Sequence, residues 1–452
     1  MVSRPLQRNQ QEKGARKICE QLRAAGFRAL FAGGCVRDLM LGKTPQDIDI
    51  ATNARPEEII ALFPKTITVG AHFGVVVVIS PEGAYEVATF RVDGPYLDGR
   101  RPVSVSFSDE KQDAQRRDFT INALFYDPQS DEVLDYVGGK ADLRAGVIRA
   151  VGDPEQRFQE DRLRLLRAVR FSARLSFPIE ADTLAAMRAM AGLLPTTSVE
   201  RIRDELLKML TDGRSRAAFE LLADTGLLEP ILPEIAAMRG VEQPAGFHPE
   251  GDVWAHTLLM LEQLPAGAAP TLALAALLHD VGKPPTQTFE DRIRFNLHDK
   301  AGAHIAREIC RRLRLPSHDT HRVTWLVGNH MRLRDFLNMR KHRRIRLARQ
   351  DGFDELLALC RMDALASHGD TAFIDDIEAW ANTIKKEMRP LPLLTGRDLI
   401  QMGYRPGPLF KRILREVETL QLDGKINTSE DAGAYIREKY PAQTQEEERH
   451  GR

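Results

Sequence analysis

The hydrophobic pattern changes its period near residue 150, and this change constrains the fold most. Before it, four apolar stretches predict short strands: RALFAGG (28–34), QDIDIAT (46–52), GVVVVIS (74–80) and YEVATF (85–90). After it, EDRLRLLRAVR (160–170) and SVERIRDELLKML (198–210) have the period of amphipathic helices. The chain is therefore expected to begin with an α+β head and to continue with helices alone.

The length of 452 residues predicts about two to four domains. We expect four regions: an α+β head at 16–150, an all-α neck and body at 151–242, a second all-α domain at 246–372 and a helical tail at 373–441. Connecting segments are expected as follows: a polar lead-in at 1–15, a long loop at 93–117, a linker at 243–252 and a disordered C-terminus.

Composition limits the classes of partner. The chain has 64 basic and 64 acidic residues, so nucleic acid must be bound by a local basic surface. Its four cysteines lie far apart without a CxxC pair, which predicts neither a disulfide framework nor a thiolate zinc site and suits a reducing cytoplasm. We expect no secretory signal, because the N-terminus is polar and has no apolar stretch. We also expect no membrane span, because no uncharged stretch approaches about 18 apolar residues.

Two aspartates alternate with isoleucines in the stretch FAGGCVRDLMLGKTPQDIDIAT (31–52). On a strand, Asp47 and Asp49 would share one face while Ile48 and Ile50 point into the core. Adjacent carboxylates on a rigid strand suit a hard divalent cation such as Mg²⁺. The alternative is a strand end that carries two solvated aspartates.

The residues around this pair suit a phosphate group. Gly33 and Gly34 allow close approach of the backbone, and the helix that follows offers N–H groups to an anion. Arg37 on that helix adds a charge-assisted contact. Glu86 is the candidate third carboxylate if its strand lies beside that of Asp49; otherwise it is an exposed strand residue.

The glycine pair, VRD and DxD at this spacing resemble the signature of the DNA polymerase β-type nucleotidyltransferases. More narrowly, residues 20–240 resemble the class II bacterial tRNA nucleotidyltransferase/poly(A) polymerase family. The resemblance implies a polymerase-β-like palm in the head. It also implies that Asp47 and Asp49 are catalytic and bind Mg²⁺, and that the glycines hold a nucleoside triphosphate. Glu86 is the candidate that would join them as a third catalytic residue.

A second stretch, RRDFTINALFYDP (116–128), resembles another motif of this family. The resemblance implies that Arg117, Asp118 and Asn122 contact the ribose and the triphosphate. The alternative is an amphipathic helix that is capped by Asp118 or Thr120.

The stretch 160–170 is expected to be one helix that selects the nucleotide. At 100° per residue, Asp161, Arg164, Arg167 and Arg170 spread over about half its circumference. The resemblance implies that the aspartate and the first arginine hydrogen-bond to the base of CTP or ATP, whose amino group is a donor; we assign all four residues to nucleotide binding. The alternative is a solvated, salt-bridged face. The stretch 198–210 is assigned a structural role in the neck.

Two segments bear on which terminal transferase this is. GAHFG (70–74) is similar to the tRNA enzymes, whereas poly(A) polymerases carry a basic run there. The loop at 93–102 is intact, while enzymes that add only CC have it shortened. The resemblance implies template-independent addition of CCA to tRNA 3′ ends from CTP and ATP, with release of pyrophosphate. An A-adding enzyme that depends on a CC-adding partner and a poly(A) polymerase are the alternatives.

The region after 246 contains LLHDVGKP (277–284) and resembles the HD-domain metal-dependent phosphohydrolases. The expected metal ligands are His256, His279, Asp280, His298, His330 and Asp363. Mixed imidazole and carboxylate ligands suit Mn²⁺, Fe²⁺, Co²⁺, Ni²⁺ or Mg²⁺. The resemblance implies a phosphatase or 2′,3′-cyclic phosphodiesterase; the alternative is a domain retained as scaffold.

Basic residues in the tail could contact the phosphate backbone of tRNA: Arg405, Lys411, Arg412 and Arg415. A solvated helix is the alternative. Two rival functions remain at this stage, an RNA-binding protein without catalysis and a hydrolase whose head only grips RNA. The sequence leaves the oligomeric state open, including a weak oligomer.

Overall fold

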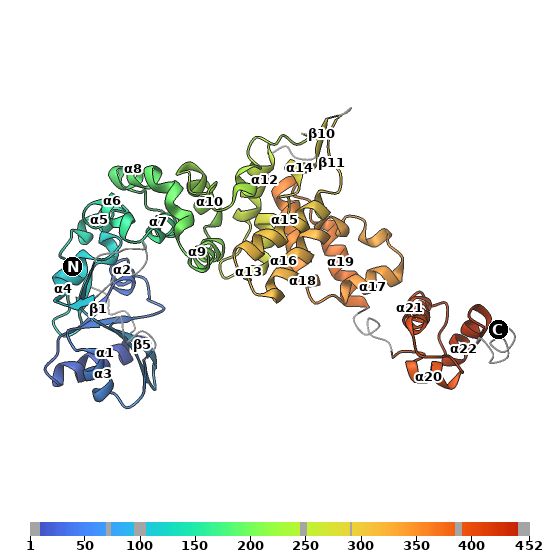
Figure 1. Ribbon diagram of the computed structural model, residues 1–452, viewed down its shortest axis with the longest axis horizontal. Helices are drawn as coiled ribbons and strands as arrows, with labels where there is room; N and C mark the ends of the chain where they lie inside the picture. The colour runs from blue at the N-terminus through green and yellow to red at the C-terminus, as the bar shows by residue number, and fades with distance from the viewer. Residues whose placement is uncertain are drawn as a thin grey trace, which may run out of the picture. The chain divides into compact units, whose positions relative to one another are not determined.

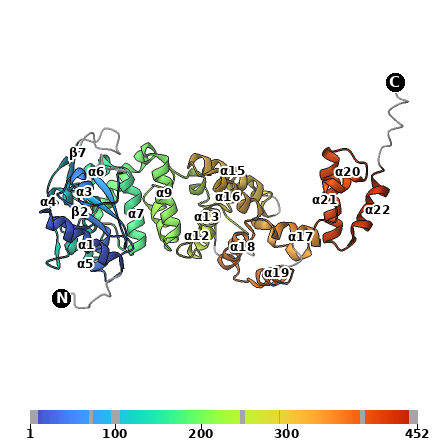
Figure 2. The ribbon, with the colours of Figure 1, turned by 90° about the horizontal axis from the view of Figure 1, so that it is seen from below.

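The computed structural model describes residues 10–68, 74–94, 105–244, 251–289, 292–384 and 391–441 (Figures 1 and 2). Contacts within the chain divide it into two compact units. The first unit comprises 1–241, 252–274 and 308–317, and the second comprises 242–251, 275–307 and 318–452.

The first unit begins with a mixed sheet of seven strands in the order β3-β4-β5-β2-β1-β8-β9. These strands are β1 (Ala29–Ala32), β2 (Asp49–Thr52), β3 (Thr66–Ile67), β4 (Val75–Ser80), β5 (Gly83–Thr89), β8 (Phe125–Asp127) and β9 (Glu132–Leu134). The pair β2–β5 is parallel, and all the other neighbours are antiparallel. A separate antiparallel pair consists of β6 (Arg91–Asp93) and β7 (Val105–Phe107).

Alternating apolar residues explain why the head strands form a sheet with a buried face. In β4, Val76 and Val78 are buried and their neighbours are more exposed. The helices α1 (Gln10–Ala24) and α3 (Pro56–Leu62) lie side by side against the sheet in Figures 1 and 2. Phe90 and Phe125 meet edge to face in the core. The expected α+β head is confirmed.

Short helices in the head and longer ones after it complete the first unit. The head contains α2 (Gly34–Met40), α4 (Glu110–Gln115), the 3₁₀ turn η2 (Thr120–Asn122) and α5 (Gly139–Ala145). The neck contains α6 (Pro154–Glu160), α7 (Leu163–Leu175), α8 (Ala181–Met190), η3 (Ala191–Thr196), α9 (Val199–Thr211), α10 (Ser215–Asp224) and α11 (Pro233–Ala236), followed by α12 (Val253–Glu262). The helical character expected after residue 150 is confirmed.

The second unit is helical apart from a small hairpin of β10 (Gln287–Phe289) and β11 (Ile293–Phe295), which the sequence did not predict. Its helices are α14 (Lys283–Thr286), α16 (Ser317–Asn329), η4 (His330–Leu333), η5 (Phe336–Asn338), α17 (Lys341–Ala348), α18 (Phe353–Ser367), α19 (Ala372–Thr383), α20 (Gly396–Gln401), α21 (Pro408–Leu422) and α22 (Ser429–Lys439). Helices α13 (Pro270–Leu278) and α15 (His298–Arg312) each have residues in both units, and Ser317 at the start of α16 belongs to the first. None of the helices described has the length and apolar character that a bilayer crossing requires.

Four expectations about local structure were wrong. Residues 10–15 belong to α1 and not to a polar lead-in. The segment 93–117 is not one loop, because its described parts include β7 and α4. Strand β2 begins at Asp49, so Asp47 lies in a bend before the strand. The predicted helix 160–170 is broken: Asp161 ends α6 in an extended conformation, and α7 begins at Leu163.

Several segments used in the sequence analysis lie wholly or partly outside the described residues. They are 1–9, 69–73, 95–104, 245–250, 385–390 and 442–452. The expectations for most of GAHFG, most of the loop at 93–102, the linker at 243–252 and the disordered C-terminus fall there and remain predictions.

Candidate functional site

The register of β2 and β5 places two carboxylates side by side. Ile50 lies opposite Val87 in this parallel pair, which brings Asp49 level with Glu86, one residue earlier on each strand. Both acidic side chains are exposed, while the residues that alternate with them are buried. Asp47 is also exposed, two residues before Asp49. The predicted adjacency of the strands that carry Asp49 and Glu86 is confirmed.

Electrostatics link these three carboxylates. Desolvation by the surrounding protein, and then the negative charge of Glu86, raises the pKa of Asp49 to about 6; Asp47 contributes in the same direction. The nearby positive charge of Arg117 opposes the shift. The negative charges of Asp47 and Glu86 around Asp49 thus outweigh the positive charge of Arg117, and three exposed carboxylates fit a hard divalent cation.

Gly33 makes room for the cation that faces this acidic group. It directly follows Ala32, which pairs with Asp49 across β1 and β2. Its φ of 77° is in the left-handed region, and a Cβ there would lie 2.9 Å from Nη1 of Arg117. The Arg117 guanidinium also donates to Asp113 and to the carbonyl of Asn122. Gly33 is thus required both for the turn and for the position of Arg117.

A buried network joins the sheet to the neck. Asp118 accepts hydrogen bonds from Arg167 at 2.8 and 2.5 Å, from the Phe119 amide and from the Asn122 side chain. Burial would raise the pKa of Asp118, but the charge and hydrogen bonds of Arg167 outweigh it and hold the pKa below its ordinary value. Asn122 in turn accepts from buried Arg37 at 2.6 Å. The structure therefore brings Asp118, Asn122, Arg37 and Arg167 together as one network.

The helix break positions Asp161 in a way that the sequence did not reveal. Its Oδ1 accepts from the Leu163 amide at the start of α7. Arg201 on α9 holds the same carboxylate with two bonds, 3.0 Å to Oδ1 and 2.7 Å to Oδ2. The sequence analysis assigned the stretch 198–210 only a structural role. Nothing beyond its helical periodicity indicated that Arg201 would contact Asp161. Oδ2 keeps room for a further donor, because a carboxylate oxygen accepts about two hydrogen bonds.

The other two candidate arginines of α7, Arg164 and Arg170, differ in their surroundings. Arg164 is buried and donates to the carbonyls of Arg157 and Arg116 and to Glu160. These contacts engage three of its five donors among the described residues. Arg170 is buried in an ion pair with Glu205 on α9 at 2.6 Å. The structure therefore places Arg170 between two helices and away from Asp161.

Three histidines of the second unit share one hydrogen-bonding arrangement. Nδ1 of His279, His298 and His330 lies 2.9, 2.9 and 2.7 Å from the carbonyls of Ala276, Phe295 and Val327, respectively. A carbonyl oxygen only accepts, so Nδ1 is the donor in each ring, and in the neutral ring Nε2 then carries the lone pair. Metal-binding histidines adopt this arrangement: Nε2 binds the ion, and the N–H of Nδ1 donates to a protein carbonyl or carboxylate.

The lone pairs of two of these histidines point at one place. Nε2 of His298 lies 3.3 Å from Nε2 of His330, and Oδ1 of Asp280 lies 3.6 and 3.9 Å from the same two atoms. Burial, followed by the charge of the other histidines, lowers the pKa of His330 to about 4, so this ring stays neutral at pH 7. Two acceptor nitrogens beside a carboxylate repel one another without a cation, and the three residues fit a metal ion.

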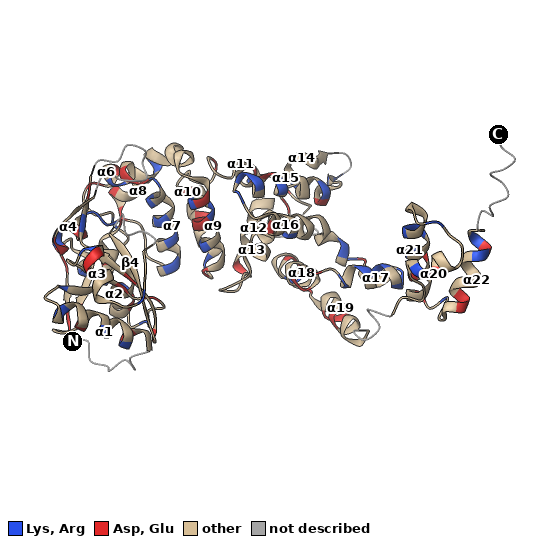
Figure 3. Ribbon diagram, turned by 60° about the horizontal axis from the view of Figure 1, so that its bottom comes forward, with Lys and Arg blue, Asp and Glu red and all other residues tan. Residues whose placement is uncertain are grey.

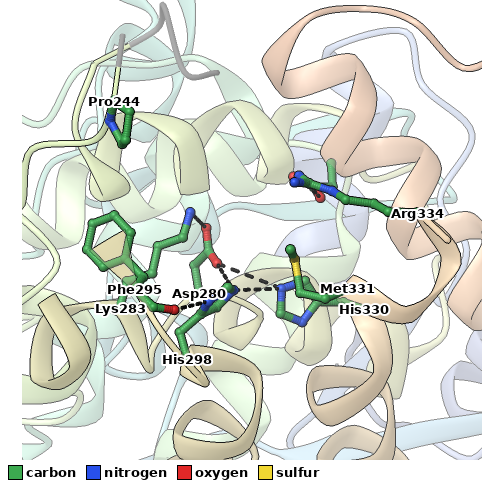
Figure 4. Close-up of a pocket in the computed structure, with 9 residues that line it drawn as sticks. Pro244, Asp280, Lys283, Phe295, His298, His330, Met331 and Arg334 are labelled. Atoms are coloured by element: carbon green, nitrogen blue, oxygen red, sulfur yellow. Dashed lines mark hydrogen bonds and ion pairs between the residues drawn. The ribbon is translucent and has the colours of Figure 1, made fainter. Parts of the chain in front are cut away.

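These residues line a cavity of about 220 Å³ (Figure 4). Lys283 reaches Oδ2 of Asp280 at 2.6 Å, and Figure 4 shows it beside Asp280, with Arg334 on another part of the wall. Asp363 also lines the cavity and lies 3.9 Å from Arg334. An anion in the cavity would therefore lie beside the candidate metal ligands and two basic side chains.

The remaining expected ligands have different standings. His279 lies 3.1 Å from Asp280 in the second unit. His256 is buried on α12 in the first unit, and its membership of the ligand set remains a prediction.

Comparisons with known proteins agree with this division of sites. Residues 29–149 match the family described as the Poly A polymerase head domain. Residues 176–239 match the probable RNA and SrmB-binding site of polymerase A, and residues 252–367 match the HD domain. The head and the HD domain imply the use of divalent metal ions.

Relatives cover the chain to different extents. The CCA-adding enzyme of Levilactobacillus brevis is 34% identical over 421 residues, which is 92% of this chain and 95% of that protein. This chain belongs to the family of CCA-adding enzymes. The CCA-adding enzyme of Geobacillus stearothermophilus is 47% identical over 220 residues, or 48% of this chain; that alignment spans about half of the relative, 54%. Among solved structures, that of the Bacillus stearothermophilus CCA-adding enzyme in complex with CTP has a TM-score of 0.73 and 28% identity, covering 96% of this chain and 98% of the other.

Asp49→Asn is expected to stabilise the metal-free protein above pH 6. The raised pKa means that the folded state retains a proton that the unfolded state releases, so the wild type loses stability as the pH rises through about 6. The uncharged Asn side chain does not titrate. Thermal melts in EDTA should therefore give the variant a midpoint roughly 2 °C or more above that of the wild type at pH 8, and little difference at pH 4.

Asp182→Asn on the exposed surface of α8 is the matched control, and its melting midpoint should not differ from that of the wild type in a way that depends on pH. Addition of Mg²⁺ should reduce the difference in melting midpoint between Asp49→Asn and the wild type, because it stabilises only the wild type. A difference that does not change with pH would contradict the proposed crowding of charge at Asp49.

Proposed function

We propose that the first unit adds CCA to the 3′ end of tRNA, using CTP and ATP without a nucleic-acid template. The observation that carries this proposal is the cluster of Asp47, Asp49 and Glu86 facing Arg117, within a chain of the CCA-adding family. The likeness to an enzyme whose structure was solved in complex with CTP supports the nucleotide.

In the proposed reaction, the 3′ hydroxyl oxygen of tRNA attacks the α-phosphorus of the nucleotide. The proton of that hydroxyl passes to water, the bond from the α-phosphorus to the oxygen that bridges it to the β-phosphate breaks, and pyrophosphate leaves. Mg²⁺ at the three carboxylates would supply charge neutralisation on both oxygens of this exchange. Asp47, Asp49 and Glu86 would hold Mg²⁺, Gly33 and Gly34 admit the phosphates, and Arg117 offers them a positive charge.

We assign base selection to Asp161 and Arg164. Oδ2 of Asp161 accepts from the exocyclic amino group, which both cytosine and adenine carry. Arg164 retains two donors for the acceptors on the base. Arg167 and Asn122 hold Asp118 and so fix the neck against the head, whereas Arg170 supports α7 from the side of α9.

Gel-resolved extension of tRNA transcripts tests this function. Transcripts that end at the discriminator base, at C and at CC should all be completed to CCA when CTP and ATP are present together. Asp49→Ala should lower the rate by at least about a hundredfold, because an ion ligand is lost. Asp182→Ala on α8 should extend all three transcripts as the wild type does.

Two other outcomes would contradict the assignment in different ways. Extension of only the CC-ended transcript would identify an A-adding enzyme. Long A-tails on any RNA would identify a poly(A) polymerase and would overturn the interpretation of GAHFG at 70–74.

Arg201→Ala tests whether Arg201 positions Asp161. Loss of both bonds frees the carboxylate to rotate, so KM for CTP and ATP should rise about tenfold and incorporation of UTP should increase. Arg203→Ala is the matched control, because Arg203 lies on the same helix and pairs with Asp204 instead. An equal loss of kcat for all nucleotides, without a change in selectivity, would assign Arg201 a merely structural role.

We also propose that the second unit hydrolyses phosphate esters, with 2′,3′-cyclic phosphates at RNA ends as substrates. A water oxygen would attack phosphorus, the bond to the 2′ or 3′ oxygen would break, and a proton would pass to that oxygen. A divalent ion at Asp280, His298 and His330 would supply the charge that activates water. The observation in favour is the pair of facing Nε2 atoms in a cavity that Lys283 and Arg334 also line.

Metal removal and return test this second activity. EDTA-treated protein should hydrolyse 2′,3′-cAMP only after addition of Mn²⁺, Co²⁺, Ni²⁺ or Mg²⁺, and His298→Gln should abolish both metal uptake and hydrolysis. His304→Gln, an exposed histidine on the same helix, is the control and should retain both. Absence of metal uptake and of hydrolysis with every ion would leave the domain as a scaffold.

Four further expectations are carried forward as proposals. They are a cytoplasmic location, tRNA contacts from Arg405, Lys411, Arg412 and Arg415, the domain boundaries at 16–150, 151–242, 246–372 and 373–441, and Mg²⁺ as the ion of the head.

A further inference from the structure

A strongly basic segment follows the last histidine of the cavity. Between residues 332 and 349, Asp335 is the one acidic residue. The basic residues of the segment are Arg332, Arg334, Arg340, Lys341, Arg343, Arg344, Arg346 and Arg349. The chain as a whole carries no net charge, so this excess is local. Figure 3 shows blue along α17, where much of the segment lies.

One face of α17 uses its charges for packing within the second unit. Arg346 and Arg349 both pair with Glu418 on α21, at 2.8 and 2.6 Å. His342 is buried and pairs with Asp423 at 2.9 Å. Arg344 lies over the ring of Trp380 on α19. These side chains explain how α17 is held in place, and they are not available to a polyanion.

The other basic side chains of the segment face solvent. Arg332, Arg334, Arg340, Lys341 and Arg343 are exposed. Within the described part of the chain, Arg340 and Arg343 have no acidic partner, and Arg334 has Asp363 only at 3.9 Å. Exposed cations attract a polyanion, because binding releases its counterions.

The N-terminal end of the segment lies at the cavity that the candidate metal ligands line. Arg334 lines this cavity, together with Asp280, His298 and His330. It also lines a second cavity of about 400 Å³, which shares His330 and Asp363 with the first and extends to Phe373. At most about 22 Å of chain separates Arg334 from Arg340, which is a few nucleotides of RNA.

We propose that Arg332, Arg334, Arg340, Lys341 and Arg343 form a basic track that binds RNA phosphates and leads the 3′ end of the strand to the cavity. This proposal rests on the proposed hydrolase activity of the second unit and adds the residues that bind the RNA strand upstream of its terminal cyclic phosphate. The track contacts phosphates and not base edges, so binding should depend on salt and little on sequence. The second cavity offers space beside the reacting phosphate for the terminal nucleoside.

The test compares a long and a short substrate of the same chemistry. One is single-stranded RNA that ends in a 2′,3′-cyclic phosphate, and the other is 2′,3′-cAMP, which is too short to reach Arg340. The double variant Arg340→Gln/Arg343→Gln should raise KM for the RNA about tenfold and leave hydrolysis of 2′,3′-cAMP unchanged. The slope of log affinity against log salt for RNA binding should become shallower by about 1.4, or 0.7 for each lost contact.

Lys300→Gln/Arg307→Gln is the matched control, since it removes two exposed charges from α15 in the same unit. It should change neither KM nor the salt slope. A double variant of the track with the wild-type KM and slope would overturn the proposal. So would binding to phosphatidylserine vesicles that needs Arg340 and Arg343 while RNA binding does not.

The two proposals fail in different ways. A wild-type protein that hydrolyses neither substrate with any metal ion refutes the hydrolase activity. The salt slope of RNA binding still tests the track in that case, because it requires no catalysis.

Discussion

The ion pair between Asp118 and Arg167 connects the parts on which the proposed transferase activity depends. Asp118 precedes η2, which lies beside the sheet, while Arg167 is in the middle of α7. A buried carboxylate is costly unless its acceptors are filled, and here Arg167, the Phe119 amide and Asn122 fill them. Asn122 is itself held by Arg37, directly after the glycine turn. Removing Arg167 would leave Asp118 charged and buried, and the head and the neck would lose the ion pair that joins them.

The two proposed metal sites follow opposite electrostatic designs. In the head, the carboxylates lie close to one another, and desolvation followed by the charge of Glu86 raises the pKa of Asp49 to about 6. Such a site suits an ion that arrives with a nucleotide and leaves with pyrophosphate. In the second unit, Asp280, His298 and His330 are buried, and each imidazole is oriented by a backbone carbonyl. That site suits an ion that stays bound.

The sequence predicted the regular elements better than it predicted the points where they end. Alternating residues such as Val76 and Val78 indicated strands because one face of a sheet is buried. The break at Asp161 was missed, because periodicity records only which residues are apolar and continues across a kink. The position of Asp47 before β2 was missed for a similar reason. Polar and apolar residues alternate from Asp47 onward, although the strand begins only at Asp49. The hairpin β10–β11 is too short to give a pattern.

By itself, the sequence determined the change from sheet to helices, the acidic pair beside a glycine turn and the set of histidines, since each of these is a local pattern. Only the tertiary structure decided which groups meet. It placed Glu86 beside Asp49, set Arg201 against Asp161, buried Arg170 with Glu205 and turned two Nε2 atoms toward each other. It also decided which arginines of α17 are neutralised by Glu418 and which remain exposed. The physical reason is that charges act through distance and burial, and both depend on segments that are far apart along the chain.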